Sequence, residues 1–304
     1  MRWLLKCTID SCKALILPRT LRRIKRRLVR YRPDFGRTAF ALDEGLLQIQ
    51  WLRETLGSLK GRTILEIGSG WEPLLPMLYA LLEVDRVYLT DLNPLMDADT
   101  AAAALEGIAR FRDRIASALQ VSDAQIEALL SPPPTDFNAF LDRLRFSYLA
   151  PCDCRRLPLP ANSVDVITSR SVFEHIPPPV LGEILKESSR ALTPGGLICH
   201  FIDNSDHWAH GDRSISRVNF LRYSDRQFRW TYINSINYQN RLRHSQYLAL
   251  FAEHGFQVLR EQSVIEPATL EAVSRIPLAS RFARFPREDL ATTDTYLLAR
   301  KIAD

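Results

Sequence analysis

"TILEIGSGWEPLLPMLY", residues 63–79, passes from a strand-like apolar run through two glycines into a helix-like segment. Because glycine tolerates positive φ and carries no side chain, Gly68 and Gly70 allow the backbone to approach a ligand closely. A dinucleotide-binding turn needs a third glycine where this chain has Glu72 and Pro73, and the Glu72 carboxylate would repel a pyrophosphate. The turn therefore predicts a nucleotide-like ligand and disfavours a dinucleotide.

An acidic residue ends the next strand-like run. This residue, Asp91, stands 21 positions after Gly70. A carboxylate about 20 residues beyond a glycine turn is typical of sites in which it accepts hydrogen bonds from ribose hydroxyls. The alternative is structural: the glycines form an ordinary tight turn, and Asp91 caps a helix that starts at Pro94.

Short apolar runs alternate with helix-like segments along the chain. Strands are expected at residues 64–67, 87–90, 146–149, 164–168, 197–202, 256–265 and 295–301, and helices at 73–82, 94–119 and 177–192. Strands that alternate with helices imply a parallel sheet covered on both faces. We therefore predict an α/β, Rossmann-like fold with a seven-stranded, mostly parallel sheet and a helical insertion at about residues 97–145.

The positive charge is concentrated at the N-terminus. Residues 1–32 hold 11 Lys and Arg and a single acidic residue, which leaves 29 basic and 34 acidic residues in the rest of the chain. Leu21, Ile24 and Leu28 recur there at helical spacing, as in helices that lie on anionic membranes. We divide the chain into a basic amphipathic arm, residues 1–35, and one domain, residues 36–304. Nucleic acid is the less favoured partner, and a solvated helix packed on the domain is an equal alternative.

Composition narrows the class of protein. With 46% hydrophobic and 25% charged residues, the chain is not disordered over its whole length. Its five cysteines are an odd set without disulfide-framework spacing, which indicates reduced thiols. No run approaches the roughly 18 apolar residues of a membrane span, and charges at Lys6, Asp10 and Lys13 interrupt any signal-peptide core. We expect a cytoplasmic protein whose arm associates peripherally with membranes.

Further motifs follow the glycine turn. They are "CDCRRLPLPANSVDVITSRSVFEHI", residues 152–176, and "LTPGGLICHFID", residues 192–203. Together with the Glu66-x-Gly68-x-Gly70 turn and Asp91, they resemble the class I S-adenosylmethionine-dependent methyltransferases, especially the group with an LPxPxxSxDxV motif. The resemblance covers roughly residues 60–205 and implies S-adenosyl-L-methionine as the cofactor. This sulfonium compound carries a positive charge and no phosphate, which suits an acidic turn.

The resemblance also implies roles for single residues. Gly68 and Gly70 would let the backbone approach the methionine part of the cofactor, and Glu66 would help to hold that loop. Asp91 would bind the ribose. Asp153 matches the acidic residue that the family places near the adenine amine.

Two loops are candidates for the chemistry, because ligands of open parallel sheets bind beyond the carboxyl ends of the strands. Residues 200–214, "HFIDNSDHWAHGDRS", crowd three histidines and three aspartates after the expected fifth strand. Methyl transfer to a hydroxyl requires removal of a proton, and the predicted base is His207, oriented by Asp206 or another nearby carboxylate. His175, in the preceding loop, is the second candidate.

Two other interpretations of residues 200–214 stay open. The polar side chains could only satisfy the backbone of a long loop, or a metal could bind His200, His207 and His210. The spacing of these histidines is not diagnostic of a metal site, so we predict no metal.

The C-terminal third suggests the acceptor. Residues 219–228 and 238–256 resemble segments of methyltransferases from polysaccharide and surface-glycan pathways. Arg222, Asn240 and Arg241 would then bind a polar or anionic acceptor, or would serve only as surface salt-bridge partners. We predict methyl transfer to a hydroxyl of a sugar or lipid-linked glycan intermediate. The alternatives are a methyltransferase of a small lipid or quinone precursor, and a noncatalytic nucleotide-binding module with a membrane- or RNA-binding arm.

Overall fold

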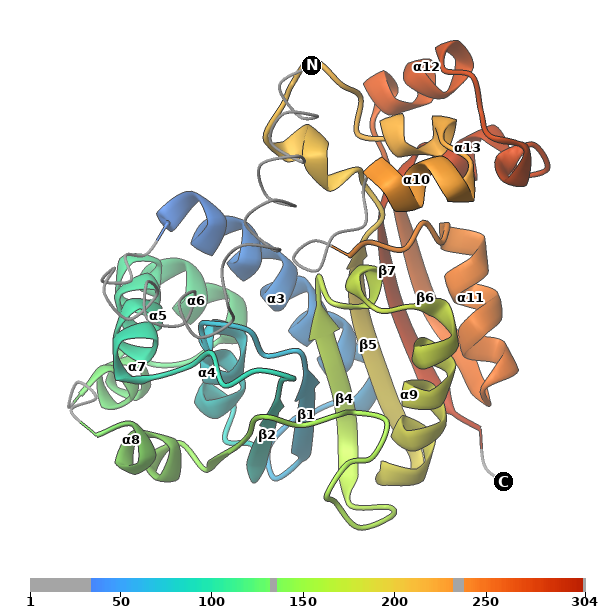
Figure 1. Cartoon of the computed structure of the whole chain (residues 1–304). Helices are drawn as coiled ribbons and strands as arrows, with labels where there is room; N and C mark the ends of the chain where they lie inside the picture. Colours follow the sequence, from blue (N-terminus) through green and yellow to red (C-terminus); the bar gives the residue numbers. More distant parts are fainter. Residues whose placement is uncertain (1–33, 132–135, 232–237, 303–304) are drawn as a thin grey trace. The chain divides into compact units, whose positions relative to one another are not determined.

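The computed structural model describes residues 34–131, 136–231 and 238–302 (Figure 1). The basic arm predicted for residues 1–35 lies outside the described residues except for its last two positions. The three consecutive prolines of the predicted helical insertion fall within residues 132–135, which also lie outside the described residues.

A seven-stranded sheet has the order β3-β2-β1-β4-β5-β7-β6. Its strands are β1 (Thr63–Ile67), β2 (Arg86–Thr90), β3 (Phe146–Leu149), β4 (Val164–Arg170), β5 (Leu192–Asp203), β6 (Phe256–Ile265) and β7 (Thr292–Lys301). Strands β2 and β4 flank β1 in parallel, and β3 pairs in parallel with β2. Residues of β1 and β4 are buried almost without interruption, as expected for parallel strands covered on both faces. The predicted Rossmann-like sheet is confirmed.

The described chain divides into two compact units, with boundaries after β4 and inside residues 178–191, β5 and β7. The N-terminal unit comprises residues 34–170, 184–199 and 298–302. The C-terminal unit comprises the described part of residues 171–183 and 200–297. Each unit has its own core and contributes its own set of functional side chains.

Helix α3 (Phe35–Leu56) begins the described chain and was not among the predicted elements. The Asp34 carboxylate caps its first turn by accepting hydrogen bonds from two backbone N–H groups. On its buried face, the Gln48 amide donates to the carbonyl of Cys199 at 2.9 Å and accepts a hydrogen bond from the Tyr79 hydroxyl. A polar residue at a core position interrupts the apolar periodicity by which such a helix is recognised.

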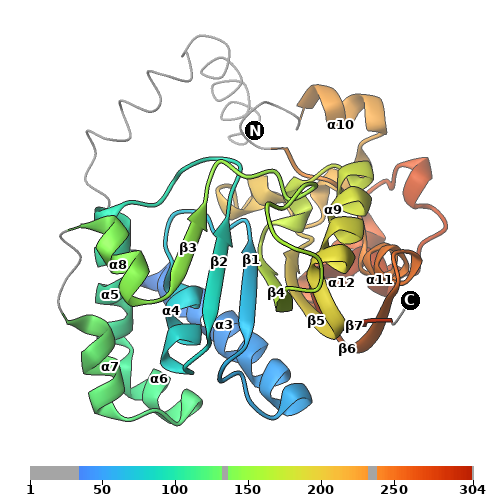
Figure 2. The ribbon, with the colours of Figure 1, turned by 90° about the horizontal axis from the view of Figure 1, so that it is seen from below.

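The N-terminal unit adds α4 (Leu74–Leu81) after β1 and a group of helices between β2 and β3. This group consists of α5 (Ala98–Arg110), α6 (Arg112–Leu119), α7 (Asp123–Leu130) and α8 (Phe137–Arg143), of which α5, α6 and α7 pack together (Figure 2). The single helix predicted over residues 94–119 is wrong in two respects. It begins only at Ala98, after a capping box of Asp97 and Thr100, and it is interrupted at Phe111.

The C-terminal unit has a hydrophobic core of its own. Its buried members are Trp208, Val218, Phe220, Leu221, Phe228, Val273, Phe282, Leu290 and Ala291. They come from the segment after β5, from α10 (Asp225–Thr231), α12 (Pro267–Arg275) and α13 (Arg287–Ala291), and from the 3-10 helix η4 (Ser280–Phe282). Helix α11 (His244–Glu253) also belongs to this unit, whereas α9 (Pro178–Ala191) is divided between the two units. This core includes Trp208 and so holds the loop that carries His207 and His210. Within the described ranges, no helix is both long enough and apolar enough to cross a membrane.

Candidate active site

The loop after β1 turns sharply at two glycines. Gly68 and Gly70 have φ values of 71° and 64°, a region that residues with a side chain rarely adopt. Between them, the N–H of Ser69 donates to the carbonyl of Thr90 at 2.9 Å and so ties the turn to the end of β2. The backbone of the turn is therefore held in place, and its two glycines have the positive φ that the sequence allowed.

Asp91 directs its carboxylate into this turn. One oxygen, Oδ2, accepts a hydrogen bond from the N–H of Gly70 at 3.1 Å, and Oδ1 accepts one from the N–H of Asn93 at 2.8 Å. Parallel pairing of Ile67 with Thr90 brings the two strand ends together, which closes the sequence separation of Gly70 and Asp91. A carboxylate offers about four acceptor sites, so Asp91 retains capacity for ribose hydroxyls. Desolvation raises the pKa of Asp91.

Glu66 is the buried acid of the turn. It is 6% exposed, and its Oε2 atom is buried without a hydrogen-bond partner among the described residues. Desolvation raises its pKa to about 7, against the lowering effects of a hydrogen bond with Ser69 and of the Arg170 charge. Buried polar atoms almost always have a partner. A cationic ligand in the turn would supply one, and the residues therefore fit S-adenosylmethionine, whose methionine part carries an ammonium group.

Asp153 lies on the segment beside Asp91. The N–H of Cys152 donates to the Asp91 carbonyl at 2.8 Å, which fixes this neighbourhood. The Asp153 carboxylate, however, receives hydrogen bonds from Arg155, including one of 2.6 Å from Nη2, and this guanidinium lowers its pKa. To accept a hydrogen bond from an adenine amine, Asp153 would have to share its oxygens with Arg155.

The described cysteines, Cys152, Cys154 and Cys199, are free thiols.

The state of Glu66 yields a pH-dependent prediction. We expect cofactor binding at pH 6 to release protons from the wild-type protein, because Glu66 is then mostly protonated and a cation favours its ionised form. Glu66→Gln should release no proton from this position. At pH 8 Glu66 is already mostly ionised, so the wild type should release almost no protons from this residue. Titration calorimetry in two buffers of different ionisation enthalpy measures the difference. Equal proton release by wild type and Glu66→Gln at pH 6 would remove Glu66 from the cofactor site.

The loop after β5 holds the predicted base. Strand β5 ends at Asp203, and the 3-10 helix η2 (His207–His210) follows. The Nε2 atoms of His207 and His210 lie 3.3 Å and 3.5 Å from Oδ2 of Asp203. Burial would raise the pKa of Asp203, but the nearby His207 and His210 and a hydrogen bond from Ser205 lower it to about 2. Asp203 is thus a partly buried anion, with 17% of its side chain exposed, that faces two imidazoles.

The carboxylate beside His207 is not that of Asp206, which was the predicted partner. Asp206 is fully buried, and its Oδ1 accepts a hydrogen bond from the N–H of Trp208 at 3.0 Å, which caps η2. The charged partner of His207 in the structure is Asp203, the second possibility that the sequence left open. The four-residue interval between Asp203 and His207 was a visible signal, but such spacing implies contact only in a helix.

The second candidate base lies in the same cluster. The 3-10 helix η1 (Phe173–His175) follows β4 through Ser171, whose φ is 53°. The ring of His175 lies 4.9 Å from the ring of His207, centroid to centroid, and its Nδ1 lies 2.8 Å from the carbonyl oxygen of Tyr238. Although 45% of the His175 side chain is exposed, desolvation lowers its pKa. We call Glu174, His175, Asp203, His207 and His210 the histidine cluster.

His200 belongs to the core and not to this cluster. It is fully buried, with ring centroids 4.2 Å from Phe173 and 5.4 Å from Phe251. Burial lowers its pKa to about 3, so His200 is neutral at physiological pH. The metal set of His200, His207 and His210 that was considered from the sequence is therefore not brought together.

Two of the three predicted acceptor-binding residues, Arg241 and Asn240, bind backbone carbonyls of neighbouring segments. Arg241 is 4% exposed and donates to the carbonyls of Phe220 and Tyr223, while Asp225 pairs with its Nη2 at 2.6 Å. These contacts assign Arg241 a structural role in place of acceptor binding, because a guanidinium so engaged has few donors left.

Asn240 has a comparable structural role. Its Nδ2 donates to the carbonyls of Phe173 and Ile176 at 2.8 Å and 2.9 Å, and its Oδ1 accepts a hydrogen bond from the Tyr247 hydroxyl. Asn240 thereby holds η1, the helix of His175. Arg222 is exposed and stays a candidate for acceptor binding.

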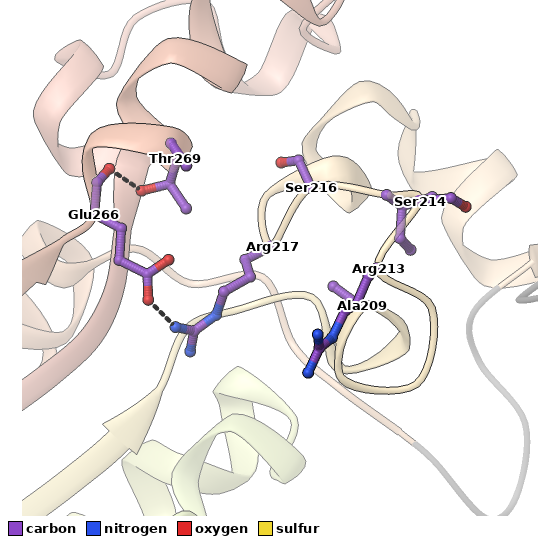
Figure 3. Close-up of a pocket in the computed structure, with 9 residues that line it drawn as sticks. Ala209, Arg213, Ser214, Ser216, Arg217, Glu266 and Thr269 are labelled. Carbon is purple, nitrogen blue, oxygen red and sulfur yellow. Dashed lines mark hydrogen bonds and ion pairs between the residues drawn. The ribbon is translucent and has the colours of Figure 1, made fainter.

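A pocket lined by apolar and charged residues lies in the C-terminal unit beside η2 (Figure 3). It has a volume of about 430 Å³ and is lined by Ala209, Arg213, Ser214, Ile215, Ser216, Arg217, Glu266, Ala268 and Thr269. Arg217 pairs with Glu266 and lies 3.9 Å from Asp294, whereas Arg213 is exposed. The guanidinium groups of Arg213 and Arg217 extend to the same side of their loop (Figure 3). Sequence reasoning missed this pocket, because its walls come from segments about 50 residues apart.

Comparison with known proteins gives one family match and a set of similar structures. Residues 137–200 match a model described as a methyltransferase domain. A chain from the complex between the Haloferax volcanii Trm112 methyltransferase activator and a putative methyltransferase is 17% identical, with a TM-score of 0.47 over 89% of this chain and 95% of that one. A putative sarcosine dimethylglycine methyltransferase from Galdieria sulphuraria is also 17% identical, with a TM-score of 0.46 over 86% of each chain. At these identities and TM-scores, the likeness assigns no acceptor or partner to this chain.

Proposed function

We propose that this S-adenosylmethionine-dependent methyltransferase transfers its methyl group to a hydroxyl of a sugar or lipid-linked glycan intermediate. The reaction class and the cofactor rest on the methyltransferase-domain match and on the Glu66, Gly68, Gly70 and Asp91 turn. The acceptor is the proposal, and the observation that carries it is the pairing of His207 with Asp203 at 3.3 Å.

This pair provides what a hydroxyl acceptor requires. When bound, the cofactor supplies an electrophilic methyl group, and the protein must align the acceptor oxygen and take up its proton. An imidazole is suited to accept that proton near neutral pH, and a buried carboxylate stabilises the imidazolium that results. The low pKa of Asp203 keeps its carboxylate ionised, and the carboxylate lies beside the His207 ring that it would orient.

The position of the cluster supports the same assignment. Ligands of open parallel sheets bind beyond the carboxyl ends of the strands. The histidine cluster directly follows the ends of β4, at Arg170, and of β5, at Asp203. His175, from the first of these loops, lies against His207 and is the alternative proton acceptor.

The pocket beside η2 supports a polar acceptor. Ser214, Ser216 and Thr269 line it together with Arg213 and Arg217, and the two guanidinium groups suit an acceptor with an anionic substituent. Glu266 and Asp294 offset the charge of Arg217, so Arg213 is the residue proposed to contact a carboxylate or phosphate on the acceptor.

The test is product formation with labelled cofactor. Cell extract, oligosaccharides with and without uronic acid or phosphate, and quinone precursors are incubated with protein and methyl-labelled S-adenosylmethionine. We expect an alkali-stable methyl ether on a sugar, and Arg213→Ala should raise KM about tenfold for the anionic acceptors alone, the effect of one lost charged hydrogen bond. Label in an alkali-labile ester, or only in a lipid without sugar, would contradict the proposed acceptor.

A further inference from the structure

The histidine cluster contains a second arrangement, which shares His207 with the proposed proton abstraction. Glu174, His175 and His207 each place one ligand-type atom so that all three atoms lie within 4.8 Å of one another. The residues come from two loops, η1 and η2, so the spacing of histidines along the sequence gave no sign of it.

The hydrogen bonds of His175 select its tautomer. Nδ1 lies 2.8 Å from the carbonyl oxygen of Tyr238, and because a carbonyl can only accept, the proton must be on Nδ1. The neutral ring therefore presents the lone pair of Nε2, which lies 3.9 Å from Oε1 of Glu174. Ligand histidines are commonly oriented in this way, by donating their other N–H to a backbone carbonyl.

His207 has a carboxylate in the equivalent supporting position. Its Nε2 lies 3.3 Å from Oδ2 of Asp203, and its ring stands at 59° to that of His175. A carboxylate beside a histidine orients the ring and raises its basicity toward a metal. His210, whose ring lies 5.3 Å from that of His207, adds a third imidazole to the same surroundings.

The charge of the cluster favours a divalent cation. Glu174 is 1% exposed with Oε1 3.9 Å from Nε2 of His175, and Oδ2 of Asp203 lies 3.3 Å from Nε2 of His207, so two carboxylates lie against the imidazoles. Nitrogen and oxygen ligands of this kind suit Zn²⁺ and related ions, which hold them at about 2.0–2.2 Å. The three ligand atoms must close further around an ion, and two of their side chains, those of His175 and His207, are 45% and 25% exposed.

We propose that Glu174, His175 and His207 form a binding site for a divalent transition cation of the Zn²⁺ class. A bound cation takes up nitrogen lone pairs of the cluster and neutralises its carboxylates. If His207 is the base, as in the proposed function, the occupied site is inhibited and removal of the ion restores turnover.

The test uses Zn²⁺ itself on the full-length protein after treatment with EDTA. Titration calorimetry without cofactor or acceptor should show a single site, and His175→Ala and Glu174→Gln should each weaken it at least about 10- to 100-fold. His244→Ala is the matched control, because His244 is also paired with a carboxylate, that of Glu261 at 2.6 Å, but lies outside the cluster. Its affinity for Zn²⁺ should equal that of the wild type.

The possible results distinguish failure of the proposed cation site from failure of the proposed methyl transfer. Denaturation midpoints identify any variant that fails to fold, and the half-exposed His175 supplies a variant that need not disturb the core. Wild-type affinity in both folded cluster variants, or an equal loss in His244→Ala, would overturn the site while leaving methyl transfer untouched. Zn²⁺ binding that weakens as predicted supports the site, and full turnover of the Zn²⁺-loaded protein would refute its inhibitory consequence.

Discussion

Replacement of His207 by alanine is expected to slow the methyl-transfer step by about 10²- to 10⁴-fold, the usual contribution of a positioned general base. Cofactor affinity should change little, because the residues predicted to bind the cofactor, the glycine turn and Asp91, do not include His207. Single-turnover rates of EDTA-treated protein with the identified acceptor measure the chemical step directly.

Two further variants show whether the loss belongs to the base. Asp203→Asn should also slow the chemical step, because it removes the charge that stabilises the imidazolium while keeping the volume of the side chain. His244→Ala, which alters a histidine paired with Glu261, should leave the rate unchanged. If His207→Ala retains near-wild-type turnover, the base lies elsewhere, and His175 is the next residue to change.

Asp91→Ala is expected to weaken S-adenosylmethionine binding by about 1.5 to 3 kcal/mol, or roughly 10- to 150-fold, the range for hydrogen bonds to a charged group. The expectation rests on the position of the carboxylate, which accepts hydrogen bonds from Gly70 and Asn93 and retains acceptor sites for ribose hydroxyls. Titration calorimetry with S-adenosylmethionine and with its demethylated product gives the affinities.

The contact with ribose can be separated from a general loosening of the turn. A cofactor analogue without the two ribose hydroxyls should bind the wild type more weakly, and Asp91→Ala should cost that analogue little more. Asp91→Asn keeps an acceptor for the Gly70 N–H and should preserve the turn. An equal loss for cofactor and analogue would mean that Asp91 only supports the loop.

The sequence by itself determined the sheet and the cofactor turn. Alternation of apolar runs with helix-like segments identified the strands, because neighbouring residues encode local backbone preference and burial. The residue type permits the positive φ at Gly68 and Gly70, and the place of Asp91 follows from parallel pairing of consecutive strands. These features depend on short stretches of chain or on a connection whose geometry is regular.

Only the tertiary structure decided which side chains meet in the irregular loops outside the sheet and the glycine turn. It paired His207 with Asp203 and assigned Asp206 to a helix cap, because the direction of a side chain in an irregular loop has no period to reveal it. It also placed His175 against His207 and turned Arg241 inward onto backbone carbonyls. These contacts join residues from separate loops, so they are set by packing of the C-terminal core and not by spacing along the chain.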